Sequence, residues 1–440
     1  MKILIDQNAF YTLAIREKDG EIEDCLAVPQ NSVVSNIYWA RVENVRGGSC
    51  FIKYAPQRLN GVLTTKQKLK VGDFVLCQAV RDEMDGKGAV FKDEIALGGE
   101  FIVLCDSFRG VKFSKKISQD KRQSFNDLSI DHEFGFIIRH SALRADKIEL
   151  QDQIEELINR YKGIRKQAFG TIIKCLFEKP CIDRVLEELN AEENIPIIAN
   201  IKTQRKEISY HDEILPLLNY YGLYEKFKLL FSRKINLSNG VEIVFDYAEA
   251  MTVVDINLSF SFGQDDSEMT KLALEEIVRQ IKLRNIGGLI VVDTSINKDL
   301  KELGELTKGL FEGDREKTSV ELVENFGLIA INRQKRYNTL ISLFYEKCLK
   351  CEMGLRKAVH TVCKDIKAKI AQMYLQTKAK YILLKASEDI FQKLSKDKTL
   401  QDLLRPDFKT KIFLKKDTLA ADYIIELIDD AKLLLDAVEI

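Results

Sequence analysis

Two aspartates and one asparagine are the residues of this 440-residue chain best suited to chemistry. Asp255 and Asn257 lie in the string VVDIN, and Asp293 ends the string IVVD. Both strings are rich in β-branched residues and predict buried strands, on which Asp255 and Asn257 face the same way. A buried carboxylate is costly unless it is paired. One divalent cation shared by the two aspartates would meet that need, whereas either aspartate alone could instead cap a turn or a helix.

An amphipathic helix is expected over residues 268–284, between the two strings. Apolar residues recur there at helical spacing, at Leu274, Ile277, Val278 and Ile281. Gly287 and Gly288 are expected to end the helix. The order strand, helix, strand is typical of a crossover unit in an α/β sheet. Ligand sites in such sheets gather at the carboxyl ends of strands, where Asp293 falls.

The composition is that of a globular protein, with 45% hydrophobic residues and only 6 prolines. Lys plus Arg and Asp plus Glu both number 67, so any nucleic-acid surface must be a local patch. The basic cluster of Arg333, Lys335 and Arg336 is interpreted as a solvated face. Nine scattered cysteines favour a reducing compartment. With no signal peptide and no long apolar run, we expect a cytoplasmic protein without a membrane-spanning segment.

Residues 36–99 are all-β in character and predict a small barrel, most simply an OB-fold. The strands are expected over 37–45, 50–54, 74–80 and 89–97. Phe51, Tyr54 and Tyr38 are candidates for stacking on bases and Lys87 for contacting phosphate, although each aromatic could equally belong to the core.

Cys348 and Cys351 form the only close cysteine pair, at a spacing typical of metal or redox sites. A tetrahedral zinc needs four ligands. His360 and Cys363 could complete the set, or a symmetric dimer could supply two cysteines from each chain. Two unremarkable thiols are the remaining alternative.

Several motifs in one order resemble the ribonuclease E/G family, and the short carboxyl end resembles the ribonuclease G type. The matching strings are AEAMTVVDIN at 248–257, RQIKLRNIGGLIVVD at 279–293, DREKTSV at 314–320, FGL at 326–328, NRQKR at 332–336 and the cysteine pair with Gly354.

The resemblance implies an α/β multidomain fold. It implies an RNase H-like domain over 1–35 and 171–225, into which an OB-fold RNA-binding domain over 36–99 and a 5′-sensor over 100–170 are inserted. A DNase I-like α/β catalytic domain over 226–345 is expected to follow. A zinc link over 346–356 and a small α/β C-terminal domain over 357–440 complete the expected order.

The resemblance also implies a magnesium-dependent endoribonuclease that cleaves single-stranded RNA in rRNA and mRNA processing and decay, leaving 5′-phosphate and 3′-hydroxyl ends. By motif position, Asp255 and Asp293 are similar to the family's Mg²⁺ ligands, and Asn257 to the residue that orients Asp255. Cys348 and Cys351 are similar to ligands of a structural Zn²⁺ shared between two chains, in a homodimer or dimer of dimers.

Other positions carry over to RNA contacts. Phe51 and Lys87 match OB-fold positions that contact RNA. The expected pocket for a 5′-monophosphate comprises Gly99, Val103, Arg139, His140 and Lys317.

The sequence departs from the family pattern at several places. His140 stands where a threonine is usual, Val62 replaces an aromatic, and no proline follows Cys348. The loop at 258–263 is shortened and lacks the usual Ser-Gly and basic character. A competing interpretation is therefore a catalytically weak, RNA-binding relative that acts as a binding or ribosome-associated factor.

Overall fold

The structure is a computed structural model that describes residues 1–47, 49–58, 60–84, 86–114, 117–125, 127–129, 133–189, 195–258, 265–294, 300–347, 355–377, 379–405, 410–417, 420, 422–434 and 436–440. The chain forms two compact units, Met1–Asn31 with Glu193–Ile440, and Ser32–Glu192. Within the described residues, no helix combines the length and apolar character that crossing a lipid bilayer requires.

The first unit begins with a five-stranded sheet of order β15-β14-β1-β2-β3. Its strands are β1 (Lys2–Gln7), β2 (Tyr11–Lys18), β3 (Glu21–Pro29), β14 (Ile197–Ala199) and β15 (Ile208–Tyr210). The dipeptide Asp19-Gly20 is a turn signal in the sequence, and it forms the two-residue hairpin between β2 and β3 with both residues at positive φ. Helices α3 (Leu217–Tyr220) and α4 (Tyr224–Leu229) pack apolar side chains against this sheet.

The second unit contains a closed five-stranded barrel, as the OB-fold prediction requires. Its strands are β4 (Ile37–Arg46), β5 (Ser49–Lys53), β6 (Gly61–Thr64), β7 (Phe74–Arg81) and β8 (Val90–Lys92). They follow the order β4-β5-β6-β8-β7, and pairing of β7 with β4 closes the barrel. Strand β13 (Lys174–Phe177) adds to β4. Residues 171–189 therefore lie with the barrel unit, although the predicted boundary placed them with the first 35 residues.

A four-stranded sheet of order β11-β12-β10-β9 lies in the same unit as the barrel. Its strands are β9 (Ala96–Gly98), β10 (Ile102–Cys105), β11 (Gly110–Phe113) and β12 (Gly135–Ile138). The single strand expected over 89–97 is wrong. Its first part, β8, lies between β6 and β7 in the barrel, while β9 leaves the barrel to pair with β10. The helices of this unit are η1 (Asp120–Phe125), η2 (His140–Leu143), α1 (Lys147–Gln167) and α2 (Cys181–Glu188).

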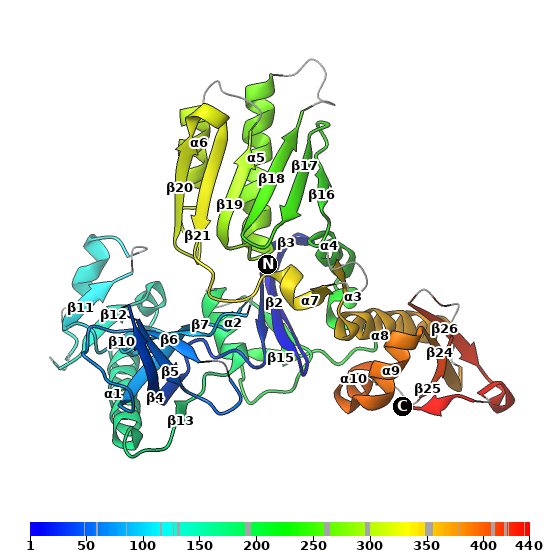
Figure 1. Cartoon of the computed structure of the whole chain (residues 1–440), viewed down its shortest axis with the longest axis horizontal. Coiled ribbons are helices and arrows are strands. Elements are labelled where there is room, and N and C mark those ends of the chain that lie inside the picture. Colours follow the sequence, from blue (N-terminus) through cyan, green and yellow to red (C-terminus); the bar gives the residue numbers. More distant parts are fainter. Residues whose placement is uncertain are drawn as a thin grey trace. The chain divides into compact units, whose positions relative to one another are not determined.

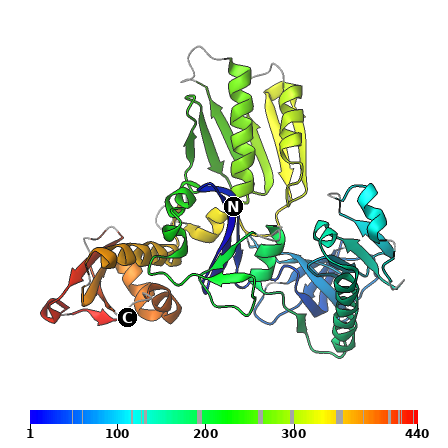
Figure 2. The same ribbon diagram turned by 180° about the vertical axis from the view of Figure 1, so that it is seen from behind.

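A six-stranded sheet of order β16-β17-β18-β19-β21-β20 forms the core of the expected catalytic region. Its strands are β16 (Lys234–Asn236), β17 (Glu242–Tyr247), β18 (Met251–Asn257), β19 (Gly288–Asp293), β20 (Thr318–Val323) and β21 (Leu328–Arg333), with η3 (Glu324–Phe326) between the last two. Helices α5 (Asp266–Leu283) and α6 (Leu300–Leu310) both lie on one face, as Figures 1 and 2 show from opposite sides. Among the described elements, no helix covers the other face.

The helix end differs from the prediction. Helix α5 stops at Leu283, and the residue with left-handed φ is Asn285 (50°) rather than a glycine. The amide of Ile286 then donates to the carbonyl of Ile281 at 2.9 Å, which satisfies one of the last helical carbonyls. Gly288, at φ 90°, begins the following strand.

The carboxyl-terminal part of the first unit is a small α/β region around a four-stranded sheet of order β26-β24-β25-β27. Its elements are α8 (Val359–Gln376), β24 (Tyr381–Ala386), α9 (Glu388–Lys396), α10 (Lys398–Leu404), β25 (Lys411–Lys416), β26 (Tyr423–Ile428), η4 (Ala431–Leu434) and β27 (Val438–Glu439). Before this region, α7 (Leu340–Phe344) packs in the core of the amino-terminal sheet, and β22 (Tyr345–Lys347) pairs with β23 (Leu355–Lys357) in a separate two-stranded sheet. Cys348 and Cys351 lie outside the described residues, so the zinc link stays a prediction.

His360 of α8 is predicted to make stability depend on pH. Its ring stacks on Phe10 with centroids 4.9 Å apart, and its Nε2 is buried without a hydrogen-bond partner in the described structure. Burial lowers the pKa of His360, and nearby Lys364 lowers it further. The unfolded chain therefore binds a proton more readily, so stability should fall as pH drops below about 6.5. His360→Phe should flatten the pH dependence of urea unfolding between pH 7 and 5, and parallel curves for both proteins would contradict this assignment.

Candidate functional site

Asp255 and Asp293 are direct neighbours across two parallel strands. Strands β18 and β19 pair in parallel with Asp255 opposite Asp293. Residues opposed in this way point to the same face, with backbones about 5 Å apart. Both side chains are half-buried, and they alternate along their strands with core residues that pack against α5 and α6, so they lie on the other face of the sheet. The two carboxylates predicted to share a cation are therefore brought to one face at adjacent positions.

Asn257 holds one of these carboxylates in place. It lies two residues after Asp255 on the same face of β18, and its Nδ2 donates to Asp255 Oδ2 at 2.9 Å. This bond limits rotation of the Asp255 carboxylate and is the contact expected of an orienting residue.

The register that aligns the aspartates depends on the opposite face of the same strands. Val254, Ile256, Ile290 and Val292 are at most 1% exposed, within the core that α5 and α6 cover. A slip of one residue would turn these side chains outward and Asp255 inward, at a large hydrophobic cost. Burial of the apolar set therefore fixes the position of the polar set.

The end of β19 is anchored by a residue that the sequence interpretation missed. Thr294, directly after Asp293, is fully buried, and its Oγ1 donates to the carbonyl of Gly327 at 2.7 Å. Gly327 has a φ of 65°, which a glycine adopts without strain. The motif FGL was the available signal, because a glycine between two strand candidates indicates a turn at positive φ.

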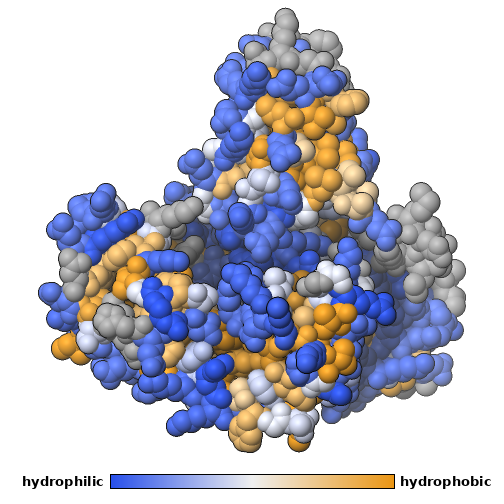
Figure 3. All heavy atoms as spheres, turned by 60° about the vertical axis from the view of Figure 1, so that its left-hand side comes forward, coloured by the Kyte–Doolittle hydropathy of each residue, from blue (hydrophilic) through white to orange (hydrophobic). Residues whose placement is uncertain are grey.

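Apolar side chains flank the carboxylates on the open face. Val253 is 36% exposed, Leu289 41% and Val323 38%. Figure 3 shows hydrophobic side chains gathered on the domain at the top of that view. An apolar surface next to the carboxylates would suit van der Waals contact with the faces of nucleobases.

The donor set fits a magnesium ion better than a metal that needs a full protein cage. Within the described residues, no group of three or more His, Cys, Asp or Glu side chains is arranged to hold a metal. Asp255 and Asp293 supply two carboxylates. Mg²⁺ is commonly bound by one or two carboxylates together with waters and substrate phosphates.

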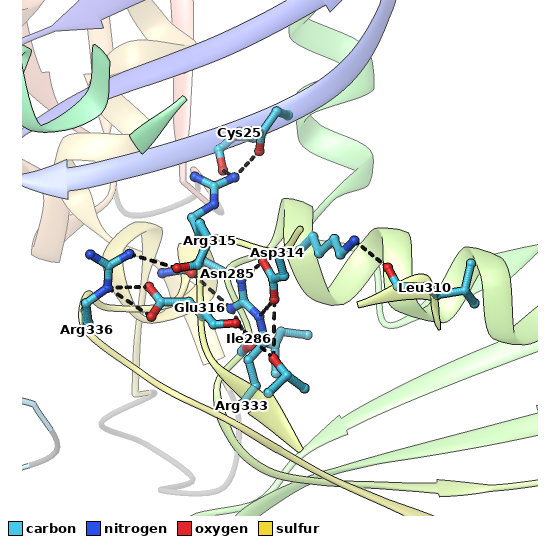
Figure 4. A network of polar contacts seen from close by, with 12 residues as sticks. Cys25, Asn285, Ile286, Leu310, Asp314, Arg315, Glu316, Arg333 and Arg336 are labelled. Atoms are coloured by element: carbon cyan, nitrogen blue, oxygen red, sulfur yellow. Dashed lines mark hydrogen bonds and ion pairs between the residues drawn. The ribbon is translucent and has the colours of Figure 1, made fainter. Parts of the chain in front are cut away.

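A network of buried and half-buried ion pairs lies at the end of β21 away from Gly327 (Figure 4). Arg333 is fully buried and contacts Asp314 at 2.7 and 3.0 Å, so the interpretation of this arginine as part of a solvated face is wrong. Arg336 pairs with Glu316 at 2.9 Å, and Arg315 pairs with Asp24 of β3. Burial alone would raise the pKa of Asp314, but hydrogen bonds and charge from Arg333 hold that pKa below its ordinary value. These ion pairs hold in place the segment that directly precedes β20.

The predicted RNA contacts of the barrel lie on separate elements. Phe51 is half-buried on β5, opposite Val62 of β6. Lys87 is exposed in the turn between β7 and β8, where its amide donates to the carbonyl of Met84 at 2.8 Å. Tyr38 and Tyr54 are buried and pack edge to face, so they belong to the barrel core.

Four of the five predicted phosphate-pocket residues lie in the four-stranded sheet and its connections. Val103 is half-buried on β10, opposite Gly98, and Gly99 follows β9. Arg139 follows β12 and is ion-paired with Glu187, whereas His140 is exposed. Burial lowers the pKa of Arg139, partly offset by the charge of Glu188. Lys317 is exposed and belongs to the other compact unit.

Comparison with known proteins identifies the family. The ribonuclease E/G family matches residues 96–336, more than half of the chain. Ribonuclease E of Haemophilus influenzae is 26% identical over 314 residues, covering 64% of this chain and 33% of that protein. Ribonuclease E of Synechocystis is 23% identical over 380 residues, covering 75% and 56%. Ribonuclease G of Escherichia coli is 27% identical over 357 residues, covering 74% and 73%. The chain belongs to the ribonuclease E/G family, and it matches a third to about half of the length of these two ribonucleases E.

Proposed function

We propose that this chain is a magnesium-dependent endoribonuclease acting on single-stranded RNA. The observation that carries the proposal is the parallel register that sets Asp255 opposite Asp293, in a chain of the ribonuclease E/G family. The relatives' names support an RNA substrate. The products expected are 5′-phosphate and 3′-hydroxyl ends.

In this proposal Asp255 and Asp293 bind the ion from one sheet face, and Asn257 keeps the Asp255 carboxylate oriented toward it. When bound, the ion would offset charge on the scissile phosphate and lower the pKa of an attacking water. The Thr294–Gly327 contact keeps the end of β19 from moving, so Asp293 meets the substrate in a preset position.

We further propose that Phe51 and Lys87 contact the RNA strand and that Arg139 contributes to binding a terminal 5′-monophosphate. A guanidinium suits a phosphate because it presents paired donors and stays charged. Exposure of Lys87 supports its part of this proposal.

Removing the metal provides the direct test. A 5′-monophosphorylated, fluorescently labelled single-stranded RNA should be cut with Mg²⁺ present and stay intact with EDTA, and restored Mg²⁺ should restore cleavage. The product ends should be ligatable 3′-hydroxyls. Cleavage that persists in EDTA and leaves 2′,3′-cyclic phosphates would contradict the proposal, because such ends come from attack by the 2′-hydroxyl rather than by a water.

A further inference from the structure

In the second unit, the carboxylate of Glu187 forms ion pairs with two cationic side chains. Arg139 Nη2 is ion-paired with Glu187 Oε1, and Lys179 Nζ with Glu187 Oε2. Glu187 belongs to α2, Arg139 follows β12, and Lys179 precedes α2. The side chains are 26%, 28% and 14% exposed for Glu187, Arg139 and Lys179, so solvent still reaches the cluster. The charge of Glu188, the next residue of α2, also acts on Arg139, so two carboxylates lie near the two cations.

Two adjacent glycines make room for these polar side chains. A Cβ at Gly98 would lie 2.6 Å from Glu187 Oε1 and 3.0 Å from Arg139 Nη2. The ion pair therefore packs directly against the backbone of this glycine. A Cβ at Gly99 would lie 2.6 Å from Gln153 Oε1. A side chain at either position would displace its neighbour.

The backbone amides of the loop after Gly99 also have hydrogen-bond partners within the chain. Gln153 Oε1 accepts hydrogen bonds from the amides of Phe101 and Ile102 at 2.8 and 2.9 Å. Arg139, Lys179 and these two amides are the kinds of donor that bind a phosphate. Each of them has a partner within the chain.

We propose that Glu187 is an internal competitor for the terminal phosphate of the RNA. Its carboxylate holds the two cations that a 5′-monophosphate would use, and it must withdraw before the phosphate can bind. This inference rests on the proposed function and adds a residue that sets its preference. A phosphomonoester carries nearly two charges and three acceptor oxygens, so it can displace a singly charged carboxylate, but only at a loss of affinity.

If Glu187 competes with the phosphate, the wild type should prefer 5′-phosphorylated RNA only weakly, and Glu187→Gln should increase that preference. Two otherwise identical short RNAs, with a 5′-phosphate or a 5′-hydroxyl, are titrated by fluorescence anisotropy in EDTA, where no cleavage is expected. The wild type should bind the two within about threefold of each other, and Glu187→Gln should favour the phosphorylated RNA by roughly tenfold. With Mg²⁺, the ratio of kcat/KM for the two RNAs should rise in parallel.

Matched variants separate this role from a general change of charge. Glu156→Gln removes the same charge from the exposed face of α1, where Glu156 pairs with Arg160, and should leave the ratio near the wild-type value. Adding Arg139→Ala to Glu187→Gln should return the ratio toward one. If Glu187→Gln unfolds, Glu187→Asp keeps the charge, shortens the reach of the carboxylate and should give an intermediate ratio.

Equal ratios in the wild type, Glu187→Gln and Glu187→Asp would overturn the inference, as would a lower phosphate preference in Glu187→Gln. Failure of the proposed function has a different signature. A wild type that never cleaves RNA with Mg²⁺ refutes the nuclease proposal, while the anisotropy ratios still decide the role of Glu187.

Discussion

Asp293→Asn is expected to reduce Mg²⁺-dependent RNA cleavage by roughly a thousandfold or more, because one of two metal-binding charges is lost and the ion's contribution is worth several kcal/mol. Asparagine has nearly the same shape, so the pairing of β19 with β18 and β21 should persist. Cleavage is measured at saturating RNA over a Mg²⁺ titration, and folding is checked by circular dichroism.

Three variants on the same sheet calibrate this result. Asp255→Asn should be as damaging as Asp293→Asn, since the two side chains are equivalent in the register. Asn257→Ala should cost less, about 10- to 100-fold, because it acts only by positioning Asp255. Asp246→Asn removes an exposed carboxylate from β17, where it pairs with Arg233, and should leave cleavage unchanged. An Asp293→Asn protein that cuts RNA at the wild-type rate would remove the basis of the site assignment.

Arg333→Met is expected to destabilise the first unit by about 3–5 kcal/mol, because it leaves the Asp314 carboxylate buried without its cation. Asp314 is 2% and Arg333 0% exposed, so water cannot replace the lost partner. The pKa of Asp314 is lowered in the folded state, so the stabilisation is present at neutral pH and is lost as pH falls through the carboxyl range. Native-state hydrogen exchange of the β21 amides measures the change.

The matching double variant distinguishes an unpaired charge from simple loss of packing. Arg333→Met with Asp314→Leu replaces both charges by apolar groups and should recover much of the stability. Arg233→Met breaks the exposed pair with Asp246 and should cost less than about 1 kcal/mol. If the single and double variants at Arg333 are equally unstable, the buried charge is not the cause.

Local patterns predicted the parts of the site that lie within one element. The period of two along β18 placed Asp255 and Asn257 on one face, and the Asn257–Asp255 hydrogen bond confirms their proximity. The 3.6-residue period located α5, and the Asp19-Gly20 dipeptide located a hairpin turn. These features depend on residues a few positions apart, whose relative directions the backbone geometry fixes.

Only the tertiary structure decided which residues from distant segments meet. The sequence showed two strands that each carry an aspartate, but the register that sets Asp255 opposite Asp293 depends on which apolar side chains α5 and α6 bury. Arg333 had the sequence signature of a solvated cation and became the most buried charge of a network with Asp314. Glu187 carried no signal for its contact with Arg139, since the two are 48 residues apart. Sequence period fixes the direction of a side chain, whereas its partner is chosen by packing over the whole chain.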